Sequence, residues 1–232
     1  MIRLINLCQT YRTTHMETTA LDNINLHVCK GEFVAVMGPS GCGKSTLLNI
    51  IGMIDSAVSG EYWFNGEEIG KRSENDLVDL RKRNIGFIFQ NFNLIDDLSV
   101  EENVALPLLY LGVPKSERKA KVAEALAVVG LENRAKHKPQ ELSGGQQQRV
   151  AVARSVVGDP KLIVADEPTG NLDTKNGEDV MQMLETLRRR GATILMVTHS
   201  PEHGACADRI ISMLDGKIVN NSPIHLVATA NI

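Results

Sequence analysis

The stretch "FVAVMGPSGCGKST", residues 33–46, decides the fold. Its apolar first half predicts a buried β-strand, and its glycines predict a loop between this strand and a following helix. From Gly38 onward it satisfies G-x-x-x-x-G-K-[S/T], in which backbone N–H groups surround phosphate oxygens, the lysine reaches the outer phosphates and the hydroxyl binds Mg²⁺. We therefore predict a nucleoside triphosphate site with Mg²⁺. Its residues are Gly38, Pro39, Ser40, Gly41, Cys42, Gly43, Lys44, Ser45 and Thr46.

Short apolar runs alternate with helical patterns along most of the chain, as in a mainly parallel sheet covered by helices. Runs at 84–90, 161–166 and 192–199 predict further core strands. Asn65-Gly66 and Asp215-Gly216 lie between strand-like runs and predict hairpins. The expected fold is an α/β P-loop NTPase core with a small antiparallel β subdomain.

A helical lobe is expected within this core, because from about residue 91 to 158 the pattern is helical only. Ser99 with Glu102 forms a capping-box signature, and a later apolar repeat of helical period stops at Gly130, a natural glycine just past a helix end. The predicted parts are a core part with the antiparallel β subdomain at 1–90, an inserted helical subdomain at 91–158, and a second core part with the C-terminal hairpin and tail at 159–232.

The composition excludes several classes of partner and location. A net charge of −3 gives no long-range attraction for polyanions, and aromatic residues are only 4% of the chain, so no nucleic-acid partner is expected. The four scattered cysteines form no C-x-x-C pair and suit a reducing cytoplasm. The apolar run at 104–113 is shorter than the roughly 20 residues that cross a bilayer. We expect a cytoplasmic chain that is attached to a membrane only through a partner.

The run "LIVADEP" predicts the acidic half of the site at the end of a buried strand. Asp166 is placed to hold Mg²⁺ directly or through water, and Glu167 could orient or deprotonate an attacking water. His199 ends the next apolar strand, where ligand groups gather in open α/β sheets. Solvated loop carboxylates and a simple polar strand end are the alternatives for these residues.

The stretch "LSGGQ", Leu142–Gln146, opens a second helix with two glycines. The first N–H groups of such a helix lack internal partners, and glycines let an anion approach closely. The chain thus has two anion-receptive helix starts but one set of lysine and carboxylates. We predict a two-fold dimer, in which this segment of each copy closes over the triphosphate that the other copy binds.

The order of these motifs resembles that of ATP-binding cassette (ABC) transporter nucleotide-binding domains over nearly the whole chain. The motifs that carry the resemblance are Gly38–Thr46, Gln90, Leu142–Gln146, Leu162–Glu167, Asn171–Asp173 and His199. The resemblance implies ATP and Mg²⁺ as cofactors and a homodimer as the active state. It also implies an integral membrane permease as partner, seated near Gln90 and the following "NFNLIDDL".

The resemblance further implies a role for each matching residue. Tyr11 would stack on adenine, Gln90 would sense Mg²⁺ and the attacking water, and Asp173 would act across the dimer. Catalytic roles are implied for Lys44, Gln90, Glu167 as the base and His199 as the contact to the γ-phosphate. Contacts to the other copy's nucleotide are implied for Ser143, Gly144, Gly145, Gln146 and Asp173. Contacts to Mg²⁺ are implied for Ser45, Gln90 and, through water, Asp166.

Finer wording narrows the resemblance. The stretches at 89–113 and 167–173 resemble the MacB/LolD/FtsE group, which implies export, lipoprotein release or resistance to antimicrobial peptides. A cell-division ATPase that signals through a membrane partner without transport is the alternative within that group. ATPases of DNA repair carry long coiled coils between these motifs, whereas about fifty residues separate Gln90 from Leu142 here. Translation-associated relatives carry two cassettes, and this chain has one P-loop.

Overall fold

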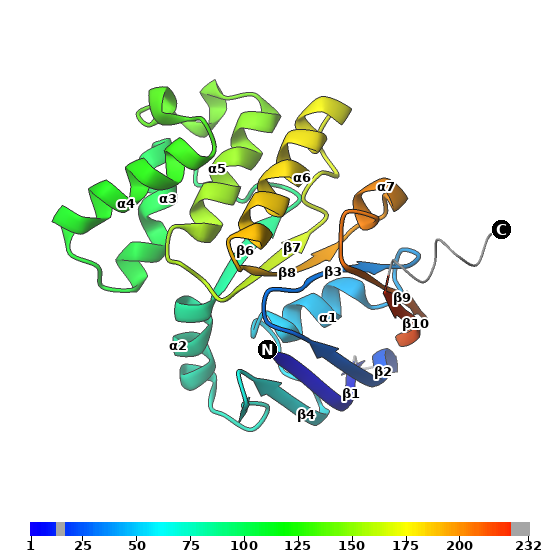
Figure 1. The fold of residues 1–232 in the computed structure, drawn as a ribbon. Coiled ribbons are helices and arrows are strands. Elements are labelled where there is room, and N and C mark those ends of the chain that lie inside the picture. The colour runs from blue at the N-terminus through cyan, green and yellow to red at the C-terminus, as the bar shows by residue number, and fades with distance from the viewer. Residues whose placement is uncertain (13–16, 224–232) are drawn as a thin grey trace. The chain divides into compact units, whose positions relative to one another are not determined.

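The structure is a computed structural model that describes residues 1–12 and 17–223. The predicted tail beyond residue 223 lies outside the described residues. Contacts divide the chain into two compact units, and Figure 1 labels most of their helices and strands. Unit 1 comprises Met1–Asp79 and Thr193–Ile232, and unit 2 comprises Leu80–Ala192.

Unit 1 contains an antiparallel sheet with the strand order β2-β1-β4-β5. Its strands are β1 (Ile2–Arg12), β2 (Glu17–Val28), β4 (Ser59–Phe64) and β5 (Glu67–Glu68). The pairing of β1 with β2 shifts register between Leu4 and Leu7, where Asn6 has a φ of 49°. The hairpin between β4 and β5 turns through Asn65 and Gly66, with φ values of 51° and 87°. This confirms the predicted antiparallel β subdomain.

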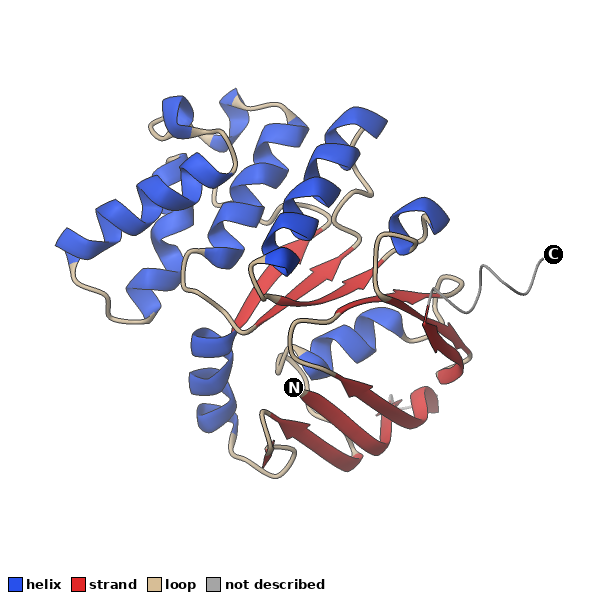
Figure 2. Ribbon diagram, in the orientation of Figure 1, coloured by secondary structure: helices blue, strands red, loops and turns tan. Residues whose placement is uncertain are grey.

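Unit 1 also contains a mainly parallel group of strands (Figure 2). These are β3 (Phe33–Met37), β8 (Thr193–Val197), β9 (Arg209–Leu214) and β10 (Lys217–Pro223). β3 pairs in parallel with both β8 and β9, and Val36 lies opposite Val197. β3 and β8 are apolar and buried along nearly their whole length, as strands of parallel sheets are. The carboxyl ends of β3 and β8 therefore lie at one edge, next to helix α1 (Lys44–Ile51).

Unit 2 contains the parallel pair β6 (Ile85–Phe89) and β7 (Leu162–Asp166), with Phe89 opposite Asp166. Helix α5 (Gly144–Val156) packs closely on β6, since a Cβ on Gly86 would lie 2.0 Å from the carbonyl oxygen of Ser155. Only glycine permits this approach.

Helices, blue in Figure 2, make up most of the rest of unit 2, and along the chain α2 spans the division between Asp79 and Leu80. The remaining helices are α2 (Glu74–Asn84), α3 (Val100–Tyr110), α4 (Lys115–Val128), α6 (Thr174–Arg189) and the 3₁₀ turns η1 (Glu132–Arg134) and η2 (Pro139–Glu141). Both hydrogen bonds of the Ser99–Glu102 capping box are present, and Gly130 has a φ of 67°. The division at residues 91 and 158 stays a prediction.

Unit 1 is completed by the short helix α7 (Pro201–Gly204). Among the residues that the structure describes, no helix has the length and apolar character needed to cross a bilayer.

Candidate nucleotide site

The predicted phosphate loop connects β3 to α1 and is held against its neighbours at both ends. Gly38, Gly41 and Gly43 have φ values of 155°, 80° and 100°. A Cβ on Gly38 would lie 2.2 Å from the carbonyl oxygen of Met213, and one on Gly43 would lie 2.3 Å from that of Ala20. Side chains at these two positions would force the backbone apart, so the tight turn into α1 depends on glycine.

The Lys44 side chain is buried inside this loop and binds its backbone. It is only 5% exposed, and its Nζ donates hydrogen bonds of 2.9 Å to the carbonyl oxygens of Gly38 and Pro39. These two acceptors are neutral, so the bonds do not neutralise the ammonium charge. The N-terminal end of α1 adds the partial positive charge of a helix start, with the exposed Ser45 in its first turn. The arrangement suits a phosphate chain.

His199 lies at the same edge of unit 1. β8 ends at Val197, and the backbone N–H of Thr198 donates to the carbonyl oxygen of Val36 at 3.2 Å, just before the loop that starts at Gly38. His199 follows and is exposed. His199 thus follows a strand that pairs in parallel with β3, the strand that leads into the phosphate loop, and its contact with a phosphate stays a prediction.

In unit 2, the predicted residues Gln90, Asp166 and Glu167 stand at the carboxyl ends of the paired strands β6 and β7. Glu167 has a φ of 46°, in the left-handed region that non-glycine residues rarely adopt. Such a conformation costs on the order of 1–2 kcal/mol and persists where the surroundings hold it, which is common at functional sites. The strained backbone therefore marks Glu167 as a candidate functional residue.

The segment after Glu167 is bonded to Gln90. The Nε2 of Gln90 donates to Oδ1 of Asn171 at 3.4 Å, and Nδ2 of Asn171 donates back to the carbonyl oxygen of Gln90 at 3.1 Å. Asn171 Nδ2 also donates to Oδ1 of Asn91 at 2.8 Å. A Cβ on Gly170 would lie 2.7 Å from Gln90 Nε2. Gln90 is therefore held by a residue of the Asn171–Asp173 motif, a contact that sequence reasoning missed.

Two polar residues of α5 bind the backbone of the loops that follow β6 and β7. Gln148 is fully buried and its Nε2 donates to the carbonyl oxygen of Pro168, in the segment that follows Glu167. Arg154 donates to the carbonyl oxygens of Phe92, at 2.7 Å, and Asn93. Both acceptor residues have positive φ, and burial lowers the pKa of the Arg154 guanidinium. In the sequence, the signal for these two contacts is a polar residue, Gln148 or Arg154, at a helix position that faces inward.

The second helix start differs from its prediction. Ser143 caps α5: its Oγ accepts from the Gln146 N–H at 3.3 Å, while Gln146 Oε1 accepts from the Ser143 N–H at 3.0 Å. The expectation that these opening N–H groups lack internal partners is therefore wrong for Gln146, and the S-x-x-Q capping-box pattern was the missed signal.

The two glycines behind this cap have different surroundings. Gly145 is buried, and a Cβ there would lie 2.1 Å from Oδ1 of Asn176 on α6. Gly144 is exposed, and its nearest neighbour would be Phe92 at 3.7 Å, an ordinary contact. Packing on α6 thus requires Gly145, whereas Gly144 leaves the helix start open.

Asp173 caps α6 and is exposed. Its carboxylate accepts from the backbone N–H of Asn176 at 2.9 Å and from the Asn176 side chain at 2.7 Å. These hydrogen bonds, the backbone bond first, lower the pKa of the Asp173 carboxyl. Asp173 is consequently a surface carboxylate that is ionised at neutral pH.

Tyr11 lies on the antiparallel sheet of unit 1, at the end of β1. The residue is 43% exposed, and its hydroxyl donates to Oδ2 of Asp55 at 2.8 Å. The predicted site residues are therefore divided: the phosphate loop, His199 and Tyr11 belong to unit 1, and the other residues belong to unit 2.

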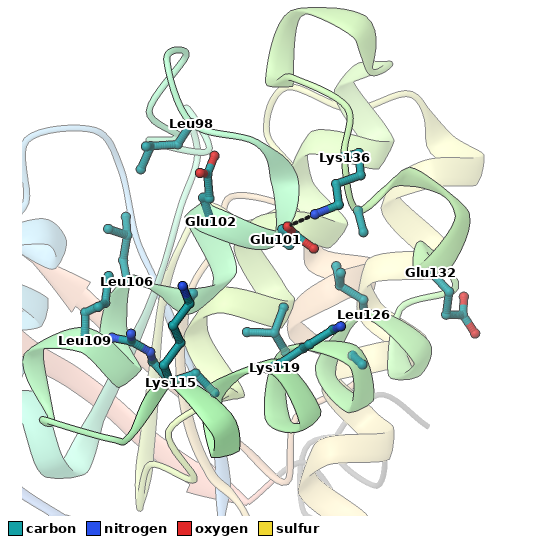
Figure 3. Close-up of a pocket in the computed structure, with 15 residues that line it drawn as sticks. Leu98, Glu101, Glu102, Leu106, Leu109, Lys115, Lys119, Leu126, Glu132 and Lys136 are labelled. Atoms are coloured by element: carbon teal, nitrogen blue, oxygen red, sulfur yellow. Dashed lines mark hydrogen bonds and ion pairs between the residues drawn. The ribbon is translucent and has the colours of Figure 1, made fainter.

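A cavity of about 740 Å³ lies elsewhere in unit 2, between α3 and α4 (Figure 3). Its lining includes Leu98, Leu106, Leu109 and Val122, with Lys136 and Glu101 paired at its side. None of the predicted site residues lines it. Motif chemistry, rather than cavity size, therefore identifies the candidate site.

Comparison with known proteins decides the family. The sequence model described as "ABC transporter" matches residues 21–170. The chain belongs to the ABC transporter family. As an ABC ATPase it has the predicted P-loop NTPase fold.

Curated ABC relatives include both short and long chains. The ABC transporter ATP-binding protein YknY of Bacillus subtilis (strain 168) is 48% identical over 219 residues, which cover 94% of this chain and 95% of that protein. The macrolide export ATP-binding/permease protein MacB of Chlorobaculum tepidum is 46% identical over 221 residues. That match covers 95% of this chain and 34% of the MacB protein. The chain thus spans about a third of the MacB relative.

Solved ABC structures agree with the fold. The ATP-binding cassette MJ0796, solved as a dimer in a post-hydrolysis state bound to ADP and Pi, is 42% identical, with a TM-score of 0.90. That comparison covers 97% of this chain and 99% of the cassette. A second dimeric structure of MJ0796 gives the same TM-score at 43% identity.

Proposed function

We propose that this chain is the ATP-hydrolysing subunit of an ABC transporter, and that it works as a head-to-tail pair of identical copies. The observation that carries the proposal is the exposed, capped helix start at Ser143 and Gly144. A Cβ added at Gly144 would have its nearest neighbour, Phe92, at 3.7 Å. A helix start of this kind receives anions. The dimeric cassette MJ0796 supports the pairing.

In this proposal the γ-phosphate of ATP replaces the loop carbonyls as the partner of Lys44. Water attacks the γ-phosphorus while Glu167 accepts the proton that the water loses, and the bond to the β-phosphate oxygen breaks to leave ADP and phosphate. His199 donates a hydrogen bond to the γ-phosphate. From the second copy, Ser143 to Gln146 contact that phosphate, and Asp173 contacts the opposite site.

The residues proposed to hold Mg²⁺ offer the oxygen atoms that hard cations prefer. They are the hydroxyl of Ser45, the amide oxygen of Gln90 and, through water, the carboxylate of Asp166. Because Nε2 of Gln90 donates to Asn171, the amide oxygen is the atom of Gln90 that remains for a cation. Mg²⁺ would neutralise charge on the phosphate oxygens.

We propose that a membrane permease docks on a groove of about 300 Å³ in unit 2, next to Gln90 in the chain. Its lining includes the basic run Arg81–Arg83, and Phe87 and Phe89 in the lining stack with ring centroids 5.6 Å apart. Tyr110 also lines the groove and is 72% exposed. This chemistry suits a permease segment with acidic and apolar side chains. It would hold the chain at the cytoplasmic face of the membrane.

The finer role proposed is that of the MacB/LolD-like group: export, lipoprotein release or resistance to antimicrobial peptides. The identity of 46% to a macrolide export protein supports it. Signalling through a membrane partner, as in FtsE-like ATPases, is the second candidate. Transport assays with the co-purified permease in vesicles separate the two, because only a transporter moves a substrate when ATP is hydrolysed.

The variant Glu167→Gln tests the proposed chemistry. It should bind ATP, form a stable dimer with it and hydrolyse it about 10²- to 10⁴-fold more slowly, the usual effect of losing a positioned base. Sizing chromatography with ATP and a phosphate-release assay measure both effects. Hydrolysis at the parental rate would show that Glu167 is not the base.

A further inference from the structure

The hydroxyl of Tyr11 is anchored by Asp55, although only the ring is needed for stacking on a base. Its Oη donates to Asp55 Oδ2 at 2.8 Å, while 43% of the residue stays exposed. A surface tyrosine without such a bond samples several side-chain rotamers. The bond restricts this freedom and leaves the ring accessible.

Asp55 is itself held in place. Its Oδ1 accepts from the Ser56 N–H at 2.8 Å, and its own N–H donates to the carbonyl oxygen of Asn49 at 3.2 Å. Nε2 of Gln9 approaches Asp55 Oδ2 at 3.5 Å, and Gln9 is buried, with its Oε1 accepting from Val58 at 3.0 Å. The carboxylate is therefore a fixed acceptor, and the position of the Tyr11 hydroxyl is fixed with it.

One helix connects this acceptor to the phosphate loop within unit 1. α1 begins at Lys44 and ends at Ile51, a length of 8 residues or about 12 Å. The turn that follows carries Asp55 and bonds back to Asn49 in the helix. The N-terminal end of α1 thus presents the phosphate loop, and its other end sets the place of Tyr11.

We infer that Asp55 is a positioning residue for nucleotide binding: it orients the Tyr11 ring for the base while α1 presents the loop for the phosphates. The inference rests on the proposed function, in which Tyr11 stacks on adenine. Asp55 itself touches no part of the nucleotide. Ordering one free side chain on binding costs about three- to tenfold in affinity, and this is the gain expected from the anchored hydroxyl.

The test uses the full chain, diluted to the monomer, and measures the Kd of MgATP by titration calorimetry. Tyr11→Phe keeps the ring and loses the anchor, and Asp55→Ala removes the acceptor. Each should weaken ATP binding about three- to tenfold, and the double variant should be no weaker than either single one. At high protein concentration, the KM of Asp55→Ala for ATP should be higher than that of the parent, while its kcat at saturating ATP should be the same.

Two controls exclude other causes. Asp55→Ala removes a negative charge, so electrostatics alone predicts tighter binding of ATP, which is opposite in sign. Asp22→Ala removes a carboxylate of unit 1 that pairs with Lys217 instead, and it should not weaken binding. Inorganic tripolyphosphate lacks a base, so neither Tyr11→Phe nor Asp55→Ala should bind it more weakly than the parent does.

The outcomes separate the inference from the proposed function. If Tyr11→Ala binds ATP as tightly as the parent, the stacking proposal fails and the inference fails with it. If Tyr11→Ala weakens ATP binding but Tyr11→Phe and Asp55→Ala do not, the inference alone is overturned. It is also overturned if Asp55→Ala weakens tripolyphosphate binding as much as ATP binding, because Asp55 would then act on the phosphate loop.

Discussion

The adjacent glycines at the start of α5 should respond to the same substitution in opposite ways. Gly145 is buried, and an added Cβ would lie 2.1 Å, 2.3 Å and 2.9 Å from the Oδ1, Cγ and Cβ atoms of Asn176. Rotation of the Asn176 side chain cannot relieve a clash that includes its own Cβ. Gly144→Ala meets no atom closer than 3.7 Å.

These contacts set the size of the effect on stability. Overpacking costs about 1–3 kcal/mol, and displacing Asn176 breaks its side-chain hydrogen bond to Asp173, worth about 1 kcal/mol. Alanine regains at most about 1 kcal/mol of helix propensity. Gly145→Ala should therefore lose about 2 kcal/mol, or about 4–8 °C in Tm for a chain of this size. Gly144→Ala should be as stable as the parent or up to about 1 kcal/mol more stable.

Gly144→Ala, the variant that keeps its stability, should nevertheless lose ATP hydrolysis. Gly144→Ala should fold and bind ATP normally but lose at least about tenfold in hydrolysis, because its methyl group keeps the other copy's phosphate from the helix start. Urea unfolding of the nucleotide-free chain and phosphate release at high protein concentration measure the two quantities. In Gly145→Ala, the second change Asn176→Gly removes the clashing side chain and should restore about 1–2 kcal/mol.

Either of two results would refute this reasoning. Parental stability of Gly145→Ala would show that Asn176 does not restrict the position. Parental hydrolysis by Gly144→Ala would show that the open helix start receives nothing from a second copy.

Three further predictions concern the loops around the site. Glu167→Gly should be about 1 kcal/mol more stable to urea than Glu167→Gln, because glycine adopts a φ of 46° without strain; equal stabilities would remove the argument from strain. Asn171→Ala should lower kcat about tenfold without changing the Kd of ATP for the monomer, because Gln90 loses its side-chain anchor; an unchanged kcat would contradict this. The folded-state pKa of Asp173 is lowered, so its cap stabilises the fold above the ordinary value of 3.8 and is lost as the pH falls further. The stability difference between the parent and Asp173→Ala should shrink below that pH, and a constant difference would contradict the role of the charge.

Much of the fold follows from local patterns. The buried parallel strands are mainly apolar runs, and a polar residue or glycine ends or directly follows each one, so β3, β6, β7 and β8 could be placed from the sequence. The capping box at Ser99 and the turn at Asn65-Gly66 depend on neighbouring residues only, and both are confirmed.

The long strands β1 and β2 were harder to predict individually. Asn6 and Asn23 have φ values of 49° and 54°, and the register of the pair shifts along its length. These breaks interrupt the alternation that identifies a strand, because the side-chain period is two residues.

The supporting contacts of the site could not be predicted, because they join residues far apart in the chain. Asn171 reaches Gln90 across 81 positions, and Arg154 reaches Phe92 across 62. The left-handed backbone of Glu167 also leaves no local signal, since glycine or asparagine is the usual residue there. Motif positions are local in sequence, whereas the groups that hold them are set by packing.

The sharing of one catalytic site between two copies is tested most directly by mixing two inactive variants. Lys44→Ala damages only the phosphate loop. Gly144→Asp places a carboxylate at the exposed helix start, where it favours the helix but repels phosphate. In an equimolar mixture half of the pairs are mixed, and each mixed pair keeps one intact site of two, so about one quarter of parental hydrolysis should return. Activity no greater than the sum of the two separate variants would contradict the shared site.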